Sequence, residues 1–109
     1  MIGADAVRGH IDLMVLSILE KEPSYAYEIS RIITTTSQGE YTIKQTSLYT
    51  AVKRLENQGC LLSEERISDS GKPRTYYFIT SAGKDQLTQK RREWAQTREL
   101  IDYFAHSYE

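Results

Sequence analysis

The chain has 109 residues, 39% hydrophobic and 27% charged, with a formal net charge of −1. This composition indicates one globular domain, or one domain with an appended element, and excludes a disordered polymer. The single cysteine excludes an internal disulfide and fits a reducing compartment. No apolar run approaches the roughly 18 residues of a membrane span, and the N-terminus lacks a signal-peptide pattern. We therefore expect a cytoplasmic protein.

The charges are unevenly distributed along the chain. Residues 41–84 contain seven basic and four acidic side chains, whereas residues 1–40 contain three and six. Affinity for phosphates depends on where cations cluster rather than on the charge of the whole chain. The middle of the chain is therefore the first place to look for a nucleic-acid contact, although the asymmetry is modest.

Hydrophobic periodicity and turn residues predict the elements in chain order. The first half is expected to hold a helix from about Ala6 to Lys21, a helix from Tyr25 to about Thr35 with Ser24 as its N-cap, and a short strand at 41–43. The second half is expected to hold a helix from Gln45 to Gln58 capped by Thr42 or Thr46, strands at 60–67 and 74–80, and a helix from Ala82 to about Ser107 capped by Ser81.

Three helices followed by a hairpin give the element order of a winged helix-turn-helix, in which the third helix enters the major groove of a DNA duplex. The fold class expected is therefore α+β, mostly α, with a long C-terminal helix. We expect residues 1–80 to form the DNA-binding domain and residues 81–109 to form a dimerisation helix.

The third predicted helix has a polar and cationic outer face. With Leu48, Val52 and Leu55 turned inward, its outer face presents Thr46, Tyr49, Thr50, Lys53 and Asn57, flanked by Ser47 and Arg54. Such a face suits contacts to phosphates and base edges. The alternative is an ordinary solvated helix face with incidental basic residues.

The turn at residues 70–74 (SGKPR) predicts a rigid, cationic hairpin tip. Gly71 permits a tight turn, Pro73 stiffens it, and Lys72 and Arg74 supply positive charge that can reach phosphates. The alternative is a plain hairpin whose charges protect its edge from aggregation.

Several blocks together resemble the PadR family of transcription regulators. They are residues 24–29 (SYAYEI), 48–59 (LYTAVKRLENQG), 70–77 (SGKPRTYY) and 79–83 (ITSAG). The likeness spans roughly residues 8–87. Ala26 stands where the family usually has glycine, and Thr50 stands where it often has proline.

The resemblance implies a dimeric repressor that is not an enzyme and inserts two third helices into successive major grooves of a pseudo-palindromic operator in double-stranded DNA. The residues it assigns to DNA contact are Thr46, Ser47, Tyr49, Thr50 and Lys53 on the third helix, and Lys72 and Arg74 on the wing. Tyr76 and Tyr77 alternate along the second strand, so one should be buried and the other exposed.

The last predicted helix gives an independent reason to expect a homodimer. Leu87, Trp94, Ile101 and Tyr108 are spaced seven residues apart, and Phe104 lies on the same side. A helix of about 26 residues is ~39 Å long, more than a head of this size can cover. The predicted dimer interface is therefore Leu87, Trp94, Ile101 and Phe104, whereas the basic run at 90–92 is expected to be a solvated face.

Trp94 admits two interpretations. It is either an anchor of the dimer interface or a platform on which a small aromatic ligand stacks, as in multidrug-responsive relatives within the family. The sequence suggests no cofactor, metal site or catalytic group: His10 and His106 are far apart, and Cys60 is expected to be a small buried residue rather than a redox switch. The rival from another class is a protein-interaction module that uses the same head and helix to dock a partner.

Overall fold

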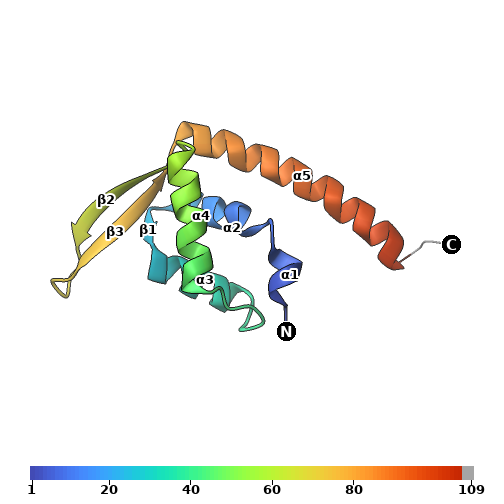
Figure 1. Cartoon of the computed structure of the whole chain (residues 1–109), viewed down its shortest axis with the longest axis horizontal. Helices are drawn as coiled ribbons and strands as arrows, with labels where there is room; N and C mark the ends of the chain where they lie inside the picture. The colour runs from blue at the N-terminus through green and yellow to red at the C-terminus, as the bar shows by residue number, and fades with distance from the viewer. Residues whose placement is uncertain (107–109) are drawn as a thin grey trace.

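The computed structural model describes residues 1–106, and the expected positions of Tyr108 and of the last helix's end at Ser107 lie outside them. The elements in chain order are α1 (Ala4–Val7), α2 (Ile11–Lys21), β1 (Ser24–Tyr25), α3 (Ala26–Thr36), α4 (Gln45–Asn57), β2 (Leu61–Ile67), β3 (Pro73–Ile79) and α5 (Ser81–His106). Figure 1 shows a head of helices with the β2–β3 hairpin projecting from one side and α5 from the other. The expected α+β, mostly helical winged fold with a long C-terminal helix is confirmed.

The single first helix expected over residues 6–21 is wrong. The structure has two helices, because Gly9 adopts a φ of +88° and interrupts the backbone between α1 and α2. A left-handed backbone at this position ends a helix and favours glycine. The apolar periodicity itself is real: Val15, Leu16 and Leu19 of α2 are buried in the core.

Two expectations about short elements are also wrong. Ser24 does not cap α3; it is buried in β1, where Ser24 and Tyr25 pair with Tyr77 and Tyr76 of β3. Residues 41–43 form no strand, although Tyr41 and Ile43 are buried. Strand β1 has only two residues and depends on pairing with the distant β3 rather than on local sequence. The periodicity around Ser24 could therefore not reveal it.

The sheet has the order β1–β3–β2 and is antiparallel throughout. Strands β2 and β3 pair from Leu61↔Ile79 to Ile67↔Pro73. The turn between them is closed by a 2.8 Å hydrogen bond from the Ser68 amide to the Lys72 carbonyl, and Gly71 supplies the positive φ of +82°. Of the two adjacent tyrosines of β3, Tyr77 is the buried one, while Tyr76 lies half-buried on the other face of the sheet.

Helix caps differ from those expected. Helix α4 begins after Lys44, with no side-chain cap from Thr42 or Thr46. At the start of α5 the cap is Thr80 rather than Ser81: the Thr80 hydroxyl accepts from the Gly83 amide at 3.0 Å and donates to the Gly59 carbonyl at 2.7 Å. This one side chain therefore fixes the root of the long helix against the end of α4.

The core lies between α2, α3, α4 and the inner face of the sheet. Its largest fully buried side chains are Val15, Leu16, Ile29, Leu48, Val52, Leu55, Leu61 and Leu87. Burying an aliphatic side chain of this size contributes about 1.5–3 kcal/mol. Helix α4 is therefore held by its inner face, which leaves the opposite face to solvent.

Gly83 is the tightest contact between α5 and the head. A Cβ atom at this position would lie 2.3 Å from the Cys60 carbonyl oxygen and 2.7 Å from Ile79 Cγ1. We expect Gly83→Ala to reduce the free energy of unfolding by about 2–3 kcal/mol, because backbone must move to admit the methyl group. Urea denaturation measures this, with Gly3→Ala as control, since a Cβ at Gly3 meets nothing within 4 Å. Equal stability of the two variants would contradict the contact.

Candidate nucleic-acid interface

Helix α4 presents a continuous solvent-facing surface between the hairpin and α2. Its inner residues Leu48, Ala51, Val52 and Leu55 are almost completely buried. The predicted contact residues Thr46, Tyr49, Thr50 and Lys53 are exposed, together with Asn57, and Ser47 is half-buried at the edge. The division into inner and outer faces is therefore as the sequence predicts.

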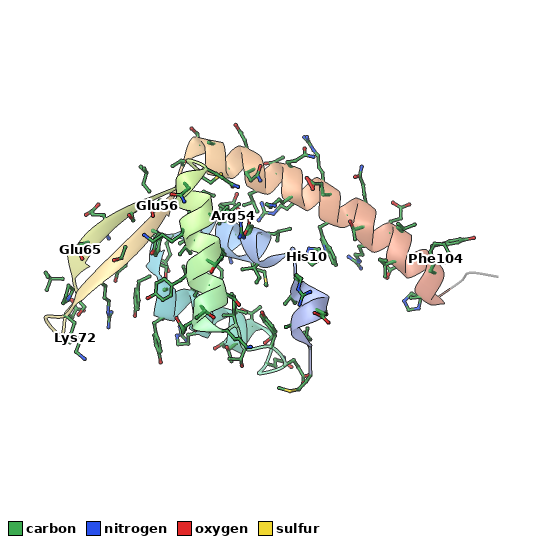
Figure 2. All side chains as sticks on the ribbon, in the orientation of Figure 1. His10, Arg54, Glu56, Glu65, Lys72 and Phe104 are labelled. Atoms are coloured by element: carbon green, nitrogen blue, oxygen red, sulfur yellow. The ribbon has the colours of Figure 1, made fainter. Side chains whose placement is uncertain are left out.

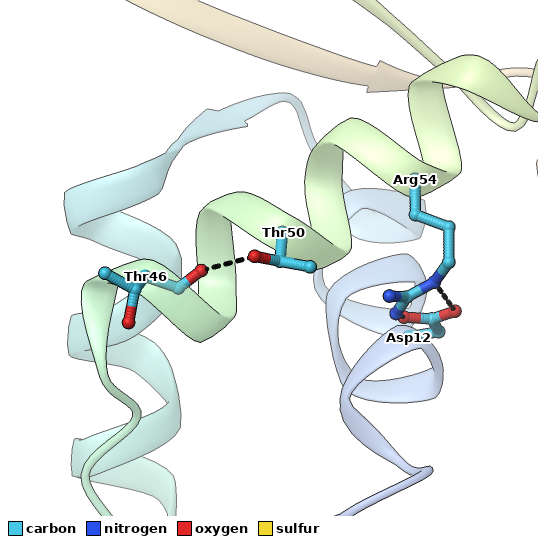
Figure 3. Close-up of polar contacts among 4 residues, drawn as sticks. All are labelled: Asp12, Thr46, Thr50 and Arg54. Carbon is cyan, nitrogen blue, oxygen red and sulfur yellow. Dashed lines mark hydrogen bonds and ion pairs between the residues drawn. The ribbon is translucent and has the colours of Figure 1, made fainter.

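The Thr50 hydroxyl is oriented by its own helix. It donates a 2.8 Å hydrogen bond to the Thr46 carbonyl one turn earlier, as Figure 3 shows. Because the single donor is used within the helix, the oxygen faces solvent as an acceptor beside the threonine methyl group. At this position the helix therefore offers an acceptor and an apolar surface, a combination that can meet an amino group or a thymine methyl in the major groove.

Arg54 ties the outer face of α4 to α2. Its guanidinium donates to both carboxylate oxygens of Asp12, with Nε 3.3 Å from Oδ2 and Nη2 bonded to Oδ1 (Figure 3). The Asp12 side chain is only 11% exposed, whereas that of Arg54 is 46% exposed. A bidentate pair of this kind fixes geometry as well as charge. The sequence places Arg54 only at the edge of the helix face, and periodicity gives no sign of a partner 42 residues away.

Lys53 and Glu56 lie on the side of α4 near the hairpin. Lys53 Nζ is 3.5 Å from Glu56 Oε1, and its side chain is 66% exposed. Glu56 Oε2 accepts a 2.5 Å hydrogen bond from the Ser63 hydroxyl of β2. Since an exposed ion pair at this distance is weak, the Lys53 ammonium remains available to an external anion while Glu56 holds the hairpin.

The hairpin carries the two predicted wing cations, Lys72 and Arg74. Lys72 is exposed at the tip (Figure 2), and it forms no ion pair with any residue of 1–106. Arg74 is half-buried and its guanidinium stacks 4.3 Å from the centre of the Tyr25 ring. Arg66, which the sequence pattern does not single out, lies 5.1 Å and 4.9 Å from the Tyr76 and Phe78 rings. The strand register explains the contacts of Arg66 with these rings. Arg66 pairs with Arg74, so it lies on the same face of the sheet as Tyr76 and Phe78.

The second half of α5 is exposed in the single chain. Every residue from 91 to 106 is exposed, including Trp94 at 43%, Ile101 at 58% and Phe104 at 57%. Leu87 corrects the predicted interface: it is fully buried in the core of its own chain, because the first turns of α5 pack on the head. In Figure 2, Phe104 lies far from the head, near the end of α5.

Trp94 lies where α5 leaves the head. Its ring meets the His10 ring edge-on, with centroids 4.9 Å apart and an interplanar angle of 70°. The two rings border a small groove of about 110 Å³ that Lys90 and Glu93 also line. The indole is thus packed against the residue that precedes α2, while Trp94 remains 43% exposed.

Comparison with known proteins identifies this architecture. The sequence model of the Transcriptional regulator PadR-like family matches residues 15–89, which is more than half of the chain. The chain belongs to the PadR-like family of transcriptional regulators.

Several relatives resemble this chain over most of their length. A transcriptional regulator from Clostridium thermocellum is 39% identical, covers 95% of this chain and 98% of its own, and superposes with a TM-score of 0.87. A PadR family regulator from Clostridium difficile is 35% identical over 89% of this chain and 99% of its own, with a TM-score of 0.74. A transcriptional regulator of Mycobacterium tuberculosis is 36% identical over 65% of this chain and 66% of its own length.

Membership of the PadR-like family assigns the winged-helix head to transcription regulation and DNA binding rather than to catalysis. No group of three or more potential metal ligands lies together within residues 1–106. None of the helices in that range combines the length and apolar character needed to cross a membrane.

Cys60 is a small buried residue, as the sequence predicts. It is 5% exposed at the start of the hairpin, and burial, reinforced by the Asp12 carboxylate, raises the pKa of its thiol. A raised pKa leaves less thiolate at pH 8, so we expect Ellman's reagent to react with the native protein at least about tenfold more slowly than with the protein in guanidinium. Equal rates in the two states would contradict the burial.

Proposed function

We propose that this chain is a homodimeric repressor that binds a pseudo-palindromic operator and is released from it by a small aromatic ligand. The observation that carries the proposal is the exposed outer face of α4, which bears Thr46, Tyr49, Thr50 and Lys53 beside a wing with Lys72 and Arg74. An α-helix fits the major groove, and hydroxyls, amides and cations on its exposed side meet phosphates and base edges. A dimer that covers a promoter excludes other proteins from the same base pairs, so binding there represses transcription.

The proposal of a dimer is supported by the exposed second half of α5. Trp94, Leu100 and Ile101 are large apolar side chains, each more than 40% exposed, along a helix that leaves the head. Several exposed large apolar side chains on one helix favour an interface, and a second copy of the same helix is the default partner in a two-fold dimer. We therefore assign residues 81–109 to dimerisation, with Trp94, Ile101 and Phe104 in the interface and Leu87 as the residue that roots the helix.

The duplex test is selection of bound fragments from a genomic library, followed by footprinting. Two α4 helices related by a two-fold axis should protect two half-sites about one helical turn, ~34 Å, apart. Binding should weaken steeply as salt rises, because each phosphate contact releases counterions. A chain that retains no duplex but captures a protein through the outer face of α4 would instead support the interaction module.

The proposal of a ligand is supported by Trp94, whose ring contacts the His10 ring and which is 43% exposed. A flat aromatic molecule that stacks on it would favour one spacing of the two heads over another, which shifts the population away from the DNA-binding geometry. Planar cationic dyes should quench the fluorescence of this single tryptophan and release a labelled duplex. If a broad dye panel neither quenches nor releases, Trp94 is an interface anchor only.

A further inference from the structure

A groove borders α4 on the side opposite the wing. It has a volume of about 580 Å³, and its walls come from α4, from the link between α1 and α2, from the first turn of α2, and from α5. Thr50 and Arg54 line this groove and also line the outer face of α4, so the two surfaces are continuous. Figure 2 places Arg54 on the side of α4 toward α2, and Lys72 on the far side of the helix at the wing tip.

The groove is cationic. Arg8, Arg54 and Lys90 line it, and its one acidic residue, Asp12, is already paired with Arg54. Lys90 is half-buried and forms no ion pair with any residue in the described range 1–106. Arg8 pairs with Asp5 at 2.6 Å, but both side chains are more than three-quarters exposed, so that pair is weak and exchangeable. Positive charge therefore remains uncompensated in the groove.

Hydroxyl groups also line the groove. Thr46 and Ser47 of the first turn of α4 lie in the same groove as Arg8 and Lys90. No hydrogen bond from either side-chain hydroxyl to another residue of 1–106 is present. Cations and free hydroxyl donors around one concave surface are the groups with which proteins bind a phosphodiester.

We propose that this groove binds the DNA backbone, with Arg8 and Lys90 as phosphate contacts. A helix in the major groove has a row of phosphates on each side, because the groove is only about 12 Å wide. The wing cations Lys72 and Arg74 serve one row, and Arg8 and Lys90 serve the other. This assignment rests on the proposed binding of α4 in a major groove, and it gives the basic run at 90–92 one DNA-facing member rather than a wholly solvated face.

The test is the salt dependence of duplex binding by Arg8→Gln and Lys90→Gln in the full chain. The probe is a fluorescein-labelled 40-base-pair duplex of mixed sequence, because phosphate contacts are independent of sequence. Removing one phosphate-binding cation per protomer removes two from the dimer, so it should reduce the slope of log K against log salt by about 1.8 and weaken binding roughly 60-fold at 0.1 M salt. Lys90→Arg keeps the charge and should keep the binding.

Arg92→Gln is the matched control. Arg92 lies two residues from Lys90 on α5, which places it about 200° around the helix. It is exposed and lines none of the grooves around α4. Circular dichroism and thermal melting of all four variants check that each is folded, so a reduced slope reports the missing cation rather than an unfolded protein.

The outcomes separate this assignment from the function on which it rests. Reduced slopes in the Arg8 and Lys90 variants, with an unchanged slope in the Arg92 variant, support the phosphate groove. Wild-type slopes in all of them, while charge reversal on α4 and the wing abolishes binding, overturn the groove and leave the proposed function intact. A wild-type chain that binds no duplex overturns both.

Discussion

Replacing Lys53 and Lys72 by glutamate should reduce duplex affinity by at least about 10³-fold at 0.1 M salt without unfolding the protein. Lys53 is on the outer face of α4 and Lys72 is at the tip of the wing; both are exposed. Neither contributes to the core, so reversal leaves the fold intact while it replaces phosphate attraction with repulsion. Fluorescence anisotropy of a labelled duplex measures the affinity, and sedimentation measures the oligomeric state.

The control for this pair is Lys21→Glu with Lys84→Glu. Both lysines are exposed and neither lines a groove around α4, yet the variant changes the net charge of the chain by the same amount. Full-strength binding by the control, with weakened binding by the test pair, assigns the effect to the site. Equal weakening in both would mean that only overall charge matters and would remove the support for an α4 interface.

The largest expected effect on assembly comes from Ile101→Asp combined with Phe104→Asp. These side chains are 58% and 57% exposed in the single chain, so the change does not disturb its core. Burial of each contributes about 1.5–3 kcal/mol in a dimer, and each occurs twice. The dimer dissociation constant should therefore rise by at least about 10⁴-fold. Light scattering coupled to size-exclusion chromatography would show a folded monomer.

Ala95→Asp with His106→Asp is the matched control for the tail. It adds two carboxylates to the same half of α5, but at 3.6 residues per turn these positions lie on the side away from Trp94 and Ile101. The control should remain a dimer. A test variant that also stays dimeric would place the dimer interface elsewhere and leave the apolar stripe unexplained.

The sequence predicts well those elements that have a periodic hydrophobic pattern or a characteristic turn within their own residues. Helix α4 shows 3.6-residue periodicity from Leu48 to Leu55, and the hairpin has alternating residues around a glycine-containing turn, so the sequence predicts both to within two residues. Strand β1 escapes such prediction because two residues become a strand only through pairing with β3. The break at Gly9 escapes it because apolar residues continue on both sides of the glycine.

For the candidate site as well, the features set by local periodicity could be predicted and those set by tertiary packing could not. Outward positions on α4 follow from periodicity, and the structure exposes Thr46, Tyr49, Thr50 and Lys53 as predicted. Tertiary contacts do not follow from periodicity. The Asp12–Arg54 pair, for example, joins residues that are 42 positions apart in the sequence. Leu87 shares the seven-residue spacing of the tail stripe but lies in the core, because spacing cannot tell which part of a long helix packs on its own head.

Two copies of the outer face of α4 should lie in major grooves of one duplex. Dimethyl sulfate footprinting tests this arrangement most directly, because the reagent methylates guanine N7 on the floor of the major groove and adenine N3 in the minor groove. We expect protection of guanine N7 in two clusters about one helical turn apart, and no such protection with the Lys53→Glu, Lys72→Glu variant. A bound duplex whose guanine N7 atoms all remain reactive would contradict it.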